Sequence, residues 1–223
     1  MGHRIVSRCG MSLAPRRVGL TGEAIAGVAL RILERDGPEA LSMRKLALDL
    51  DVTPATIYWH VGNRDEVVAA ALELFRSRNR PAKPRGVHGR SRIVSILRQI
   101  RAEAVEHAQV FRAAYAAGLT GRLELPWQQL LARELLDTAL SPGEAADVLR
   151  GLLYTVAGFL AMGSESSRET IGNAEAWAKL ADGSIDETLR ARMATTEPDD
   201  VVFERTITAL VDALVPAENG ATR

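Results

Sequence analysis

Cysteine, aromatic residues and long apolar runs are all scarce in this sequence. Among its 223 residues there is one cysteine, Cys9, which excludes an internal disulfide framework and a cysteine-rich zinc module. The longest uncharged apolar stretch covers 14 residues, 151–164, and is too short to span a bilayer. Aromatic residues make up 4% of the chain, whereas Ala, Leu and Arg, which favour helices, are abundant. We therefore expect a helical globular protein of the reducing cytoplasm, with no membrane partner.

The N-terminal residues 1–20 contain arginines but no acidic residue. They lack the apolar run that a secretory signal peptide needs before its cleavage site. We therefore predict a flexible basic arm over residues 1–20. Met11 is an alternative translation start, and its use would remove Arg4 and Arg8 from this arm.

Charge is distributed unevenly along the chain, although the formal net charge is zero. Residues 1–90 hold 15 Lys/Arg against 9 Asp/Glu, a balance of +6, and residues 91–223 hold 13 against 19, a balance of −6. A basic N-terminal part is typical of a domain that meets a polyanion such as nucleic acid. A chance distribution is the alternative, because the excess is modest.

Capping residues predict four helices before residue 79. Ser42 and Thr53 are suitable N-caps, and Pro54 follows Thr53 at the first helical position, where its missing N–H costs nothing. Asn63 is a further N-cap, and Glu66 stands three residues later, as in a capping box. The four helices are expected at about residues 21–36, 42–50, 54–60 and 63–77.

A stretch rich in proline, glycine and basic residues, 79–90, is predicted to link this part to a second one. Beyond it the apolar spacing predicts helices near residues 91–107, 109–118, 124–139, 142–163, 174–181 and 199–215. The helix at 142–163 is apolar on most sides, so it is either deeply buried or pressed against another subunit. The predicted fold class is all-α, with an N-terminal three-helix helix-turn-helix domain over residues 21–78 and a helical C-terminal domain over residues 91–223.

The two short helices at 42–50 and 54–60, joined by a three-residue turn, form a helix-turn-helix pattern. The first short helix is then fixed on the core and crosses a phosphate backbone. The second is held with its N-terminal residues free to enter the major groove, which is wide enough for one helix. Such a corner alone is a weak indication of DNA binding, because many helical proteins contain one.

The peptide from Leu41 to Val67 is more specific than a helical corner. It contains Arg-Lys-Leu-Ala, Thr-Ile-Tyr-Trp-His-Val and Asn-Arg, and it strongly resembles the DNA-binding segment of the Tet repressor family of transcriptional regulators. Within that family it is most similar to the branch of the Tet repressor itself. The resemblance covers about residues 21–75 and, more weakly, residues 125–163, where Leu-Pro-Trp and Ser-Pro-Gly-Glu resemble the C-terminal domain of that branch.

This resemblance implies roles for individual residues. Arg44 matches an arginine that reaches a guanine, a contact that contributes about 1–3 kcal/mol of discrimination. The resemblance also places the backbone N–H groups that follow Asn63 near a phosphate. Ile57 and Trp59 are expected mainly to hold the second short helix on the core. Recognition-helix positions that touch bases or nearby phosphate, together with phosphate-facing positions, complete the predicted DNA-binding set: Arg44, Thr53, Pro54, Ala55, Thr56, Tyr58, Trp59, His60 and Arg64. Solvated charges and ordinary packing aromatics are the alternatives for these residues.

The sequence departs from the family pattern in the turn and at the start of the second short helix. Asp51 stands where the family usually has glycine, and because Asp tolerates the left-handed backbone, we expect the turn to survive. Pro54 and Ala55 occupy positions where the Tet repressor has a Gln and a Pro. The missing amide, a natural partner for adenine, predicts a different operator sequence.

Residues 91–223 are expected to bind a small apolar effector and to form a homodimer. The resemblance places Phe111 where a histidine helps to hold drug-chelated magnesium, so a tetracycline–metal complex is disfavoured and no metal or cofactor is expected. Candidate pocket residues are Phe111, Tyr115, Trp127, Tyr154 and Phe159, with ordinary core packing as the alternative for each. Candidate dimer residues lie on the two apolar helices, with internal core as the alternative: Leu149, Leu152, Leu153, Val156, Leu160, Ile207, Leu210, Val211 and Leu214. A short helix around Trp177 is expected to cover the mouth of the pocket.

Two other classes of protein are alternatives to a DNA-binding regulator. An enzyme is not favoured, because the sequence has no Gly-rich phosphate loop, no Gly-x-Ser-x-Gly elbow and no His-Glu-x-x-His, and no catalytic residue is predicted. A helical protein-interaction adaptor with a vestigial DNA-binding end is the second rival. The expected partners are double-stranded operator DNA, a second copy of the chain and an apolar effector.

Overall fold

The computed structural model describes residues 20–87, 89–162, 174–179, 183–195 and 199–217, and every regular element in these ranges is helical. The predicted all-α class is therefore confirmed. In chain order the elements are α1 (Gly22–Asp36), η1 (Pro38–Ala40), α2 (Met43–Asp49), α3 (Pro54–His60), α4 (Arg64–Arg78), α5 (Gly89–Glu106), α6 (Ala108–Ala116), α7 (Thr120–Leu136), α8 (Pro142–Met162), α10 (Ala174–Lys179), α11 (Glu187–Met193) and α12 (Asp199–Leu214).

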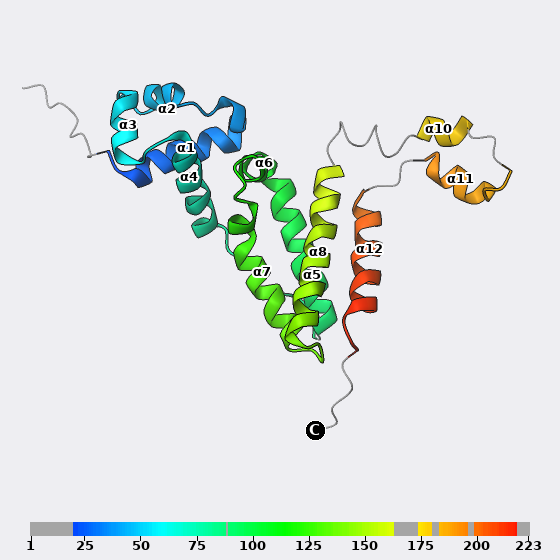
Figure 1. The fold of residues 1–223 in the computed structure, drawn as a ribbon. Coiled ribbons are helices and arrows are strands. Elements are labelled where there is room, and N and C mark those ends of the chain that lie inside the picture. Colours follow the sequence, from blue (N-terminus) through cyan, green and yellow to red (C-terminus); the bar gives the residue numbers. More distant parts are fainter. Residues whose placement is uncertain (1–19, 88, 163–173, 180–182, 196–198, 218–223) are drawn as a thin grey trace, which may run out of the picture.

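Helices α1–α4 gather at one end of the molecule, next to α6 (Figure 1). Thr21 begins α1 as predicted, because its side chain accepts a hydrogen bond from the Ala24 N–H at 3.1 Å. Helices α1 and α4 pack along each other through fully buried side chains such as Ile25, Leu33 and Phe75. Buried residues of α2 and α3 join the same cluster, so the helix-turn-helix is attached to a rigid base.

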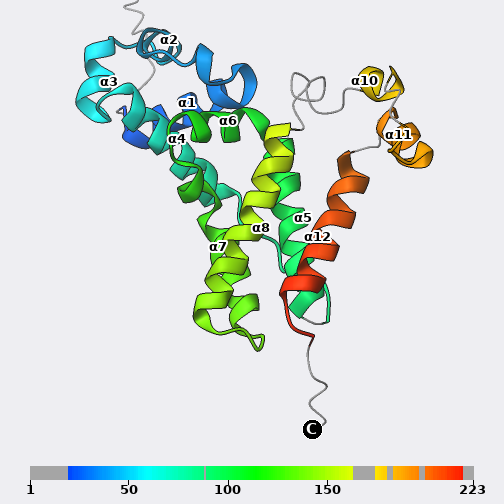
Figure 2. The ribbon, with the colours of Figure 1, turned by 45° about the vertical axis from the view of Figure 1, so that its right-hand side comes forward.

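The long helices α5, α7, α8 and α12 form the other end of the molecule, with α10 and α11 set apart from them (Figure 2). Arginines of α5 hold its neighbours in register. Arg98 donates to both carboxylate oxygens of Glu204 on α12 at 2.8 Å, and Arg92 pairs at 2.5 Å with Glu134 on α7, a carboxylate whose side chain is 8% exposed. Breaking this nearly buried pair would leave a charge without compensation.

The predicted helices all recur with small shifts at their ends. Helix α8 begins as expected, because Ser141 and Glu144 hydrogen-bond each other reciprocally. Helix α11 was not predicted; its N-cap, Asp186, accepts from the Leu189 N–H. The predicted arm (residues 1–20) lies outside the described residues, apart from residue 20. None of the described helices combines the length and the apolar character needed to cross a bilayer.

Candidate DNA-binding site

Helices α2 and α3 are held at a fixed corner by their caps and by the turn between them. Ser42 caps α2 by accepting from the Lys45 N–H at 3.1 Å, and Thr53 caps α3 by accepting from the Thr56 N–H at 3.3 Å. Asp51 in the turn has φ of 52°, in the left-handed region. The prediction that this turn survives with Asp51 in the place of the usual glycine is therefore confirmed.

Helix α3 rests on the core through one fully buried side chain, Ile57. Pro54 and Ala55 at its N-terminus are exposed, as is 53% of Tyr58. The expectation that Trp59 packs on the core is wrong, because 82% of this side chain is exposed. Two residues after Ile57, it lies about 200° around the helix, on the opposite side from the core.

Two further predicted contact residues differ in exposure. Arg44 is exposed on α2, and its guanidinium forms no ion pair or hydrogen bond with the rest of the described chain. His60 is half-buried and meets the ring of Trp59 edge to face, with centroids 4.8 Å apart. An arginine without an intramolecular partner retains the donors that bidentate recognition of guanine uses.

Arg64 at the start of α4 is already bound within the domain. Its Nε donates to the Leu41 carbonyl at 3.0 Å, and its Nη2 donates to the Pro38 carbonyl at 2.8 Å. These bonds join the N-terminus of α4 to the segment that leads into α2. The side chain is still 46% exposed, and its Nη1 lies 4.0 Å from a carboxylate oxygen of Asp65.

The N-terminus of α4 has fewer open amides than predicted. Asn63 accepts from the N–H groups of Asp65 and Glu66 at 2.8 and 3.0 Å, and Glu66 accepts from the Asn63 N–H at 2.7 Å. This confirms the predicted capping box. It also occupies the amides that we expected to bind a phosphate, which leaves the Arg64 N–H in this turn.

The candidate pocket residues are distributed over different parts of the molecule. Phe111 and Trp127 are buried, but they belong to two separate apolar clusters. Phe159 is half-buried and meets Phe203 edge to face at 5.2 Å. Tyr115 and Tyr154 are 81% and 73% exposed. The structure therefore does not bring these five side chains into one enclosed cavity of a single chain.

A polar group missed by the sequence reading lies next to Trp127 on α7. Burial raises the pKa of Glu124, whose carboxylate accepts a hydrogen bond from Gln128 at 3.5 Å. Glutamate and glutamine are common on helix surfaces, so their types alone gave no indication of burial.

The candidate dimer residues divide into two groups. Those in the first group are almost fully buried within one chain and form its core: Leu152, Val156, Ile207 and Val211. The others are half-buried or, for Leu214, 39% exposed: Leu149, Leu153, Leu160, Leu210 and Leu214. Helices α8 and α12 thus carry more apolar side chains than the core of a single chain buries.

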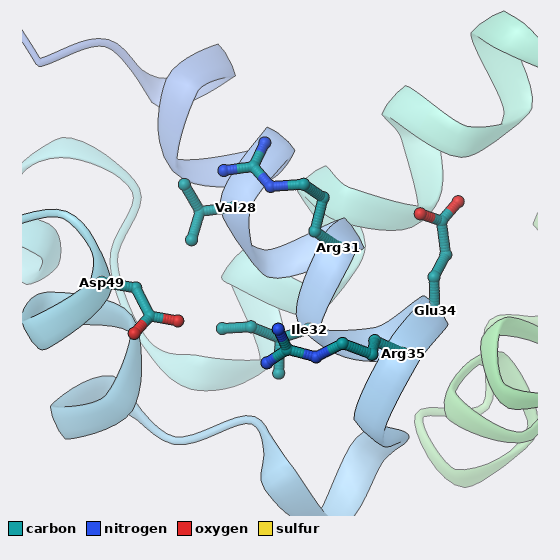
Figure 3. Close-up of a pocket in the computed structure, with 6 residues that line it drawn as sticks. All are labelled: Val28, Arg31, Ile32, Glu34, Arg35 and Asp49. Atoms are coloured by element: carbon teal, nitrogen blue, oxygen red, sulfur yellow. The ribbon is translucent and has the colours of Figure 1, made fainter.

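A hollow of about 410 Å³ lies beside α1 and α2, and it is lined by Val28, Arg31, Ile32, Glu34, Arg35 and Asp49 (Figure 3). Its four charged side chains are two cations, Arg31 and Arg35, and two anions, Glu34 and Asp49. Arg35 donates to Asp36 at 2.8 and 2.6 Å and lowers the pKa of that carboxyl, and Asp49 pairs with Lys45 at 2.7 Å. This balance of charge does not favour a ligand of one sign. Nowhere in the described ranges do three His, Cys, Asp or Glu side chains gather as metal ligands would.

Comparison with known proteins finds relatives of this segment. Residues 25–71 match the profile of the bacterial regulatory proteins of the tetR family. An HTH-type transcriptional regulator of Saccharopolyspora erythraea is 33% identical over 133 residues, which is 58% of this chain and 54% of that protein. The match thus spans about half the length of that relative.

Solved structures share the fold over most of the chain. Apo ActR from Streptomyces coelicolor superposes with a TM-score of 0.69 at 23% identity, covering 91% of this chain and 96% of ActR. The complex of the same protein with actinorhodin gives a TM-score of 0.67 at 22% identity, covering 87% and 96%. Through residues 25–71, which hold its helix-turn-helix, this chain is similar to the tetR family of bacterial regulatory proteins.

Proposed function

We propose that this chain is a ligand-responsive transcriptional repressor that binds a palindromic DNA operator as a homodimer. The observation that carries the proposal is the exposed surface of α3 on its rigid base. A short helix that buries one side chain and exposes most of the others is suited to enter a major groove. Arg44 on α2 and Tyr58 on α3 then face DNA without any rearrangement of the core.

Base reading is assigned to Arg44 and to the N-terminal turn of α3. Arg44 has the free donors for a bidentate contact with guanine, whereas Pro54 and Ala55 offer apolar surface suited to a thymine methyl group. Thr56, Tyr58 and His60 serve as contacts to bases or phosphate. Trp59, which the core does not use, adds a large apolar surface to the recognition helix.

The homodimer is assigned to the outward faces of α8 and α12. Tyr154, Ala157 and Gly158 form an exposed stripe on α8, and Ala209 and Ala213 continue an exposed stripe on α12. A Cβ added at Gly158 would meet no atom within 4 Å. Small residues on an open apolar face allow two helices of a second copy to approach closely. A dimer presents two recognition helices to two half-sites, which one helix-turn-helix cannot do.

Release by an effector is supported by the likeness to ActR, whose structure in complex with actinorhodin shares this fold. In the proposed mechanism the dimer without ligand holds its recognition helices at groove spacing. An apolar effector that binds the other arrangement more tightly shifts the population away from DNA. Its effect is limited to the difference between its affinities for the two states.

Selection from random duplex DNA tests the DNA-binding part of the proposal. The full chain should enrich a palindromic site, and gel shifts should show affinity that falls steeply with salt. The Arg44→Ala variant should enrich a site with one position relaxed in each half. Failure to enrich any palindrome would count against the repressor and in favour of a protein-interaction adaptor.

Sedimentation of charged variants tests the dimer. Ala157→Glu places a charge on the proposed interface of α8, and Ala102→Glu places the same charge on an exposed position of α5 as a control. The first should sediment as a monomer at concentrations at which the wild type and the control are dimers. Equal dimerisation of all three proteins would contradict the assigned interface.

A further inference from the structure

Helix α7 carries two carboxylates, and they differ in whether a cation compensates their charge. Glu134 is nearly buried and pairs with Arg92 of α5 at 2.5 Å. Glu124 accepts one long hydrogen bond, from Gln128 Nε2 at 3.5 Å, and it forms no ion pair with any residue that the structure describes. A carboxylate shielded from water costs free energy unless hydrogen-bond donors or a cation compensate it. Glu124 therefore has unused capacity to bind a donor.

Glu124 lies on the strip of α7 that faces the other long helices. Gln128, Leu131 and Leu135 follow it at the spacing of one helix face, and both leucines are fully buried. Glu124 itself is half-buried, and burial raises the pKa of its carboxyl. The side chain thus belongs to a core-facing strip but is not sealed from solvent, so a ligand can reach it.

Two clusters of buried apolar side chains meet at Glu124. The first consists mainly of the cores of α1–α4 and α6, and it includes Leu123 of α7. The second contains side chains of α5, α7, α8 and α12, and it includes Trp127. Leu160 of α8 packs against both clusters, so the apolar surroundings are continuous there. A ligand that reaches this carboxylate therefore needs an apolar body to fit its neighbours.

The charge pattern favours an organic cation as the partner of this carboxylate. A metal ion is disfavoured, because no three His, Cys, Asp or Glu side chains gather as ligands among the residues that the structure describes. Arg122, two residues earlier on α7, is exposed and acts elsewhere: with the nearer Arg76, it lowers the pKa of Glu73 on α4. Residues 91–223 hold 13 Lys/Arg against 19 Asp/Glu, an excess of negative charge that attracts cations.

We infer that the effector of this chain is an apolar organic amine whose protonated nitrogen binds the Glu124 carboxylate. The amide carbonyl of Gln128, one turn further along α7, accepts a second N–H of the same ammonium group. An ammonium group has three donors and can satisfy both acceptors, whereas an alcohol has one donor and a carboxylate has none. That the amine acts as an effector rests on the proposed function, but its binding requires neither DNA nor a second copy.

Three rigid probes with the same apolar body and different head groups test this inference: adamantylamine, adamantanol and adamantanecarboxylate. Isothermal titration calorimetry on the full chain without DNA gives the affinity for each probe. The wild type should bind the amine about 10- to 100-fold more tightly than the alcohol, the factor that corresponds to one shielded hydrogen bond to a charged group. The carboxylate probe should bind most weakly. Equal affinities for amine and alcohol, or no binding of the amine, would overturn the inference.

Substitutions at Glu124 test the assigned residue. Glu124→Gln keeps the shape of the side chain and removes its charge, so it should abolish the preference for the amine and leave the affinity for the alcohol unchanged. Glu124→Asp keeps the carboxylate and should keep a preference for the amine. Glu106→Gln removes the same charge from an exposed position of α5 and, as the matched control, should retain the wild-type preference.

A preference for the amine that survives in Glu124→Gln would overturn the assignment to this residue. The outcome is independent of the selection of operator DNA, because the probes are measured without DNA. Failure to enrich an operator would refute the repressor and leave the amine site standing, whereas loss of the amine preference would refute the site and leave the repressor standing.

Discussion

Arg64 has two proposed roles, one in holding the fold together and one in binding a phosphate of DNA, and replacing it tests each role by a different measurement. The Arg64→Ala change removes two hydrogen bonds, from Nε to the Leu41 carbonyl at 3.0 Å and from Nη2 to the Pro38 carbonyl at 2.8 Å. A hydrogen bond from a charged donor contributes about 1.5–3 kcal/mol when it is shielded from water. Because the side chain is 46% exposed, water replaces part of that contribution, and we expect a total loss of about 1–3 kcal/mol.

A loss of this size lowers the melting temperature by roughly 2–12 °C for a chain of this length. Circular dichroism would follow the melting of the wild type, Arg64→Ala and Arg64→Lys. Lysine keeps the charge but cannot bridge two carbonyls with a planar fork, so Arg64→Lys should lose most of the same stability. Arg31→Ala, an exposed arginine of α1, is the control and should melt close to the wild type.

Measuring operator binding at several salt concentrations tests the second proposed role of Arg64, the phosphate contact. If its exposed N–H groups also reach a phosphate, Arg64→Ala lowers the slope of log K against log salt by about 0.9 for each copy of the chain, or roughly 1.8 for the dimer, and Arg64→Lys retains it. Unchanged melting of Arg64→Ala would refute the structural argument. An unchanged salt slope would refute the phosphate contact that the family resemblance implies.

Three further predictions follow from particular contacts. Arg44→Ala should relax base choice at one position of each half-site by about 1–3 kcal/mol and leave urea unfolding unchanged, and a uniform loss over all sequences would contradict its role as a base reader. Gly37→Ala should lower the free energy of unfolding, measured in urea, by about 1–3 kcal/mol. The reason is that φ of Gly37 is +80° and the new Cβ would lie 2.7 Å from Gln109 Oε1. An unchanged free energy of unfolding would show that this turn relaxes freely. Burial raises the pKa of Glu124, so wild-type stability should fall as pH rises from about 4.5, the ordinary value for Glu, through the raised native pKa. Glu124→Gln should remove that fall, and parallel stability profiles of the two proteins would refute it.

Local features of this protein followed directly from the sequence. Caps at Ser42, Thr53 and Asn63 depend on one side chain and the amides two or three residues later, so their positions could be predicted without tertiary contacts. The left-handed turn at Asp51 and the start of the helix after Ser141 could be predicted for the same reason, because each depends only on residues close together in the chain. Helix α11 was missed because its apolar side chains, in the absence of any buried residue, follow no clear stripe.

The apolar pattern predicted which helices are amphipathic, but not what covers each apolar face. Leu152 and Leu214 belong to similar stripes, yet one is fully buried and the other is 39% exposed. Trp59 resembles a core residue by type and is the most exposed aromatic of the helix-turn-helix. Only packing decides such cases, because burial depends on which elements meet in space.

Sequence alone determined the helical class, the positions of most helices and the segment suited to bind DNA, because these depend on periodicity, caps and residues adjacent in the chain. The tertiary structure decided that Arg64 holds two backbone carbonyls and that α6 joins the N-terminal core. Both depend on contacts between residues far apart in the chain, and these form only when the helices pack together.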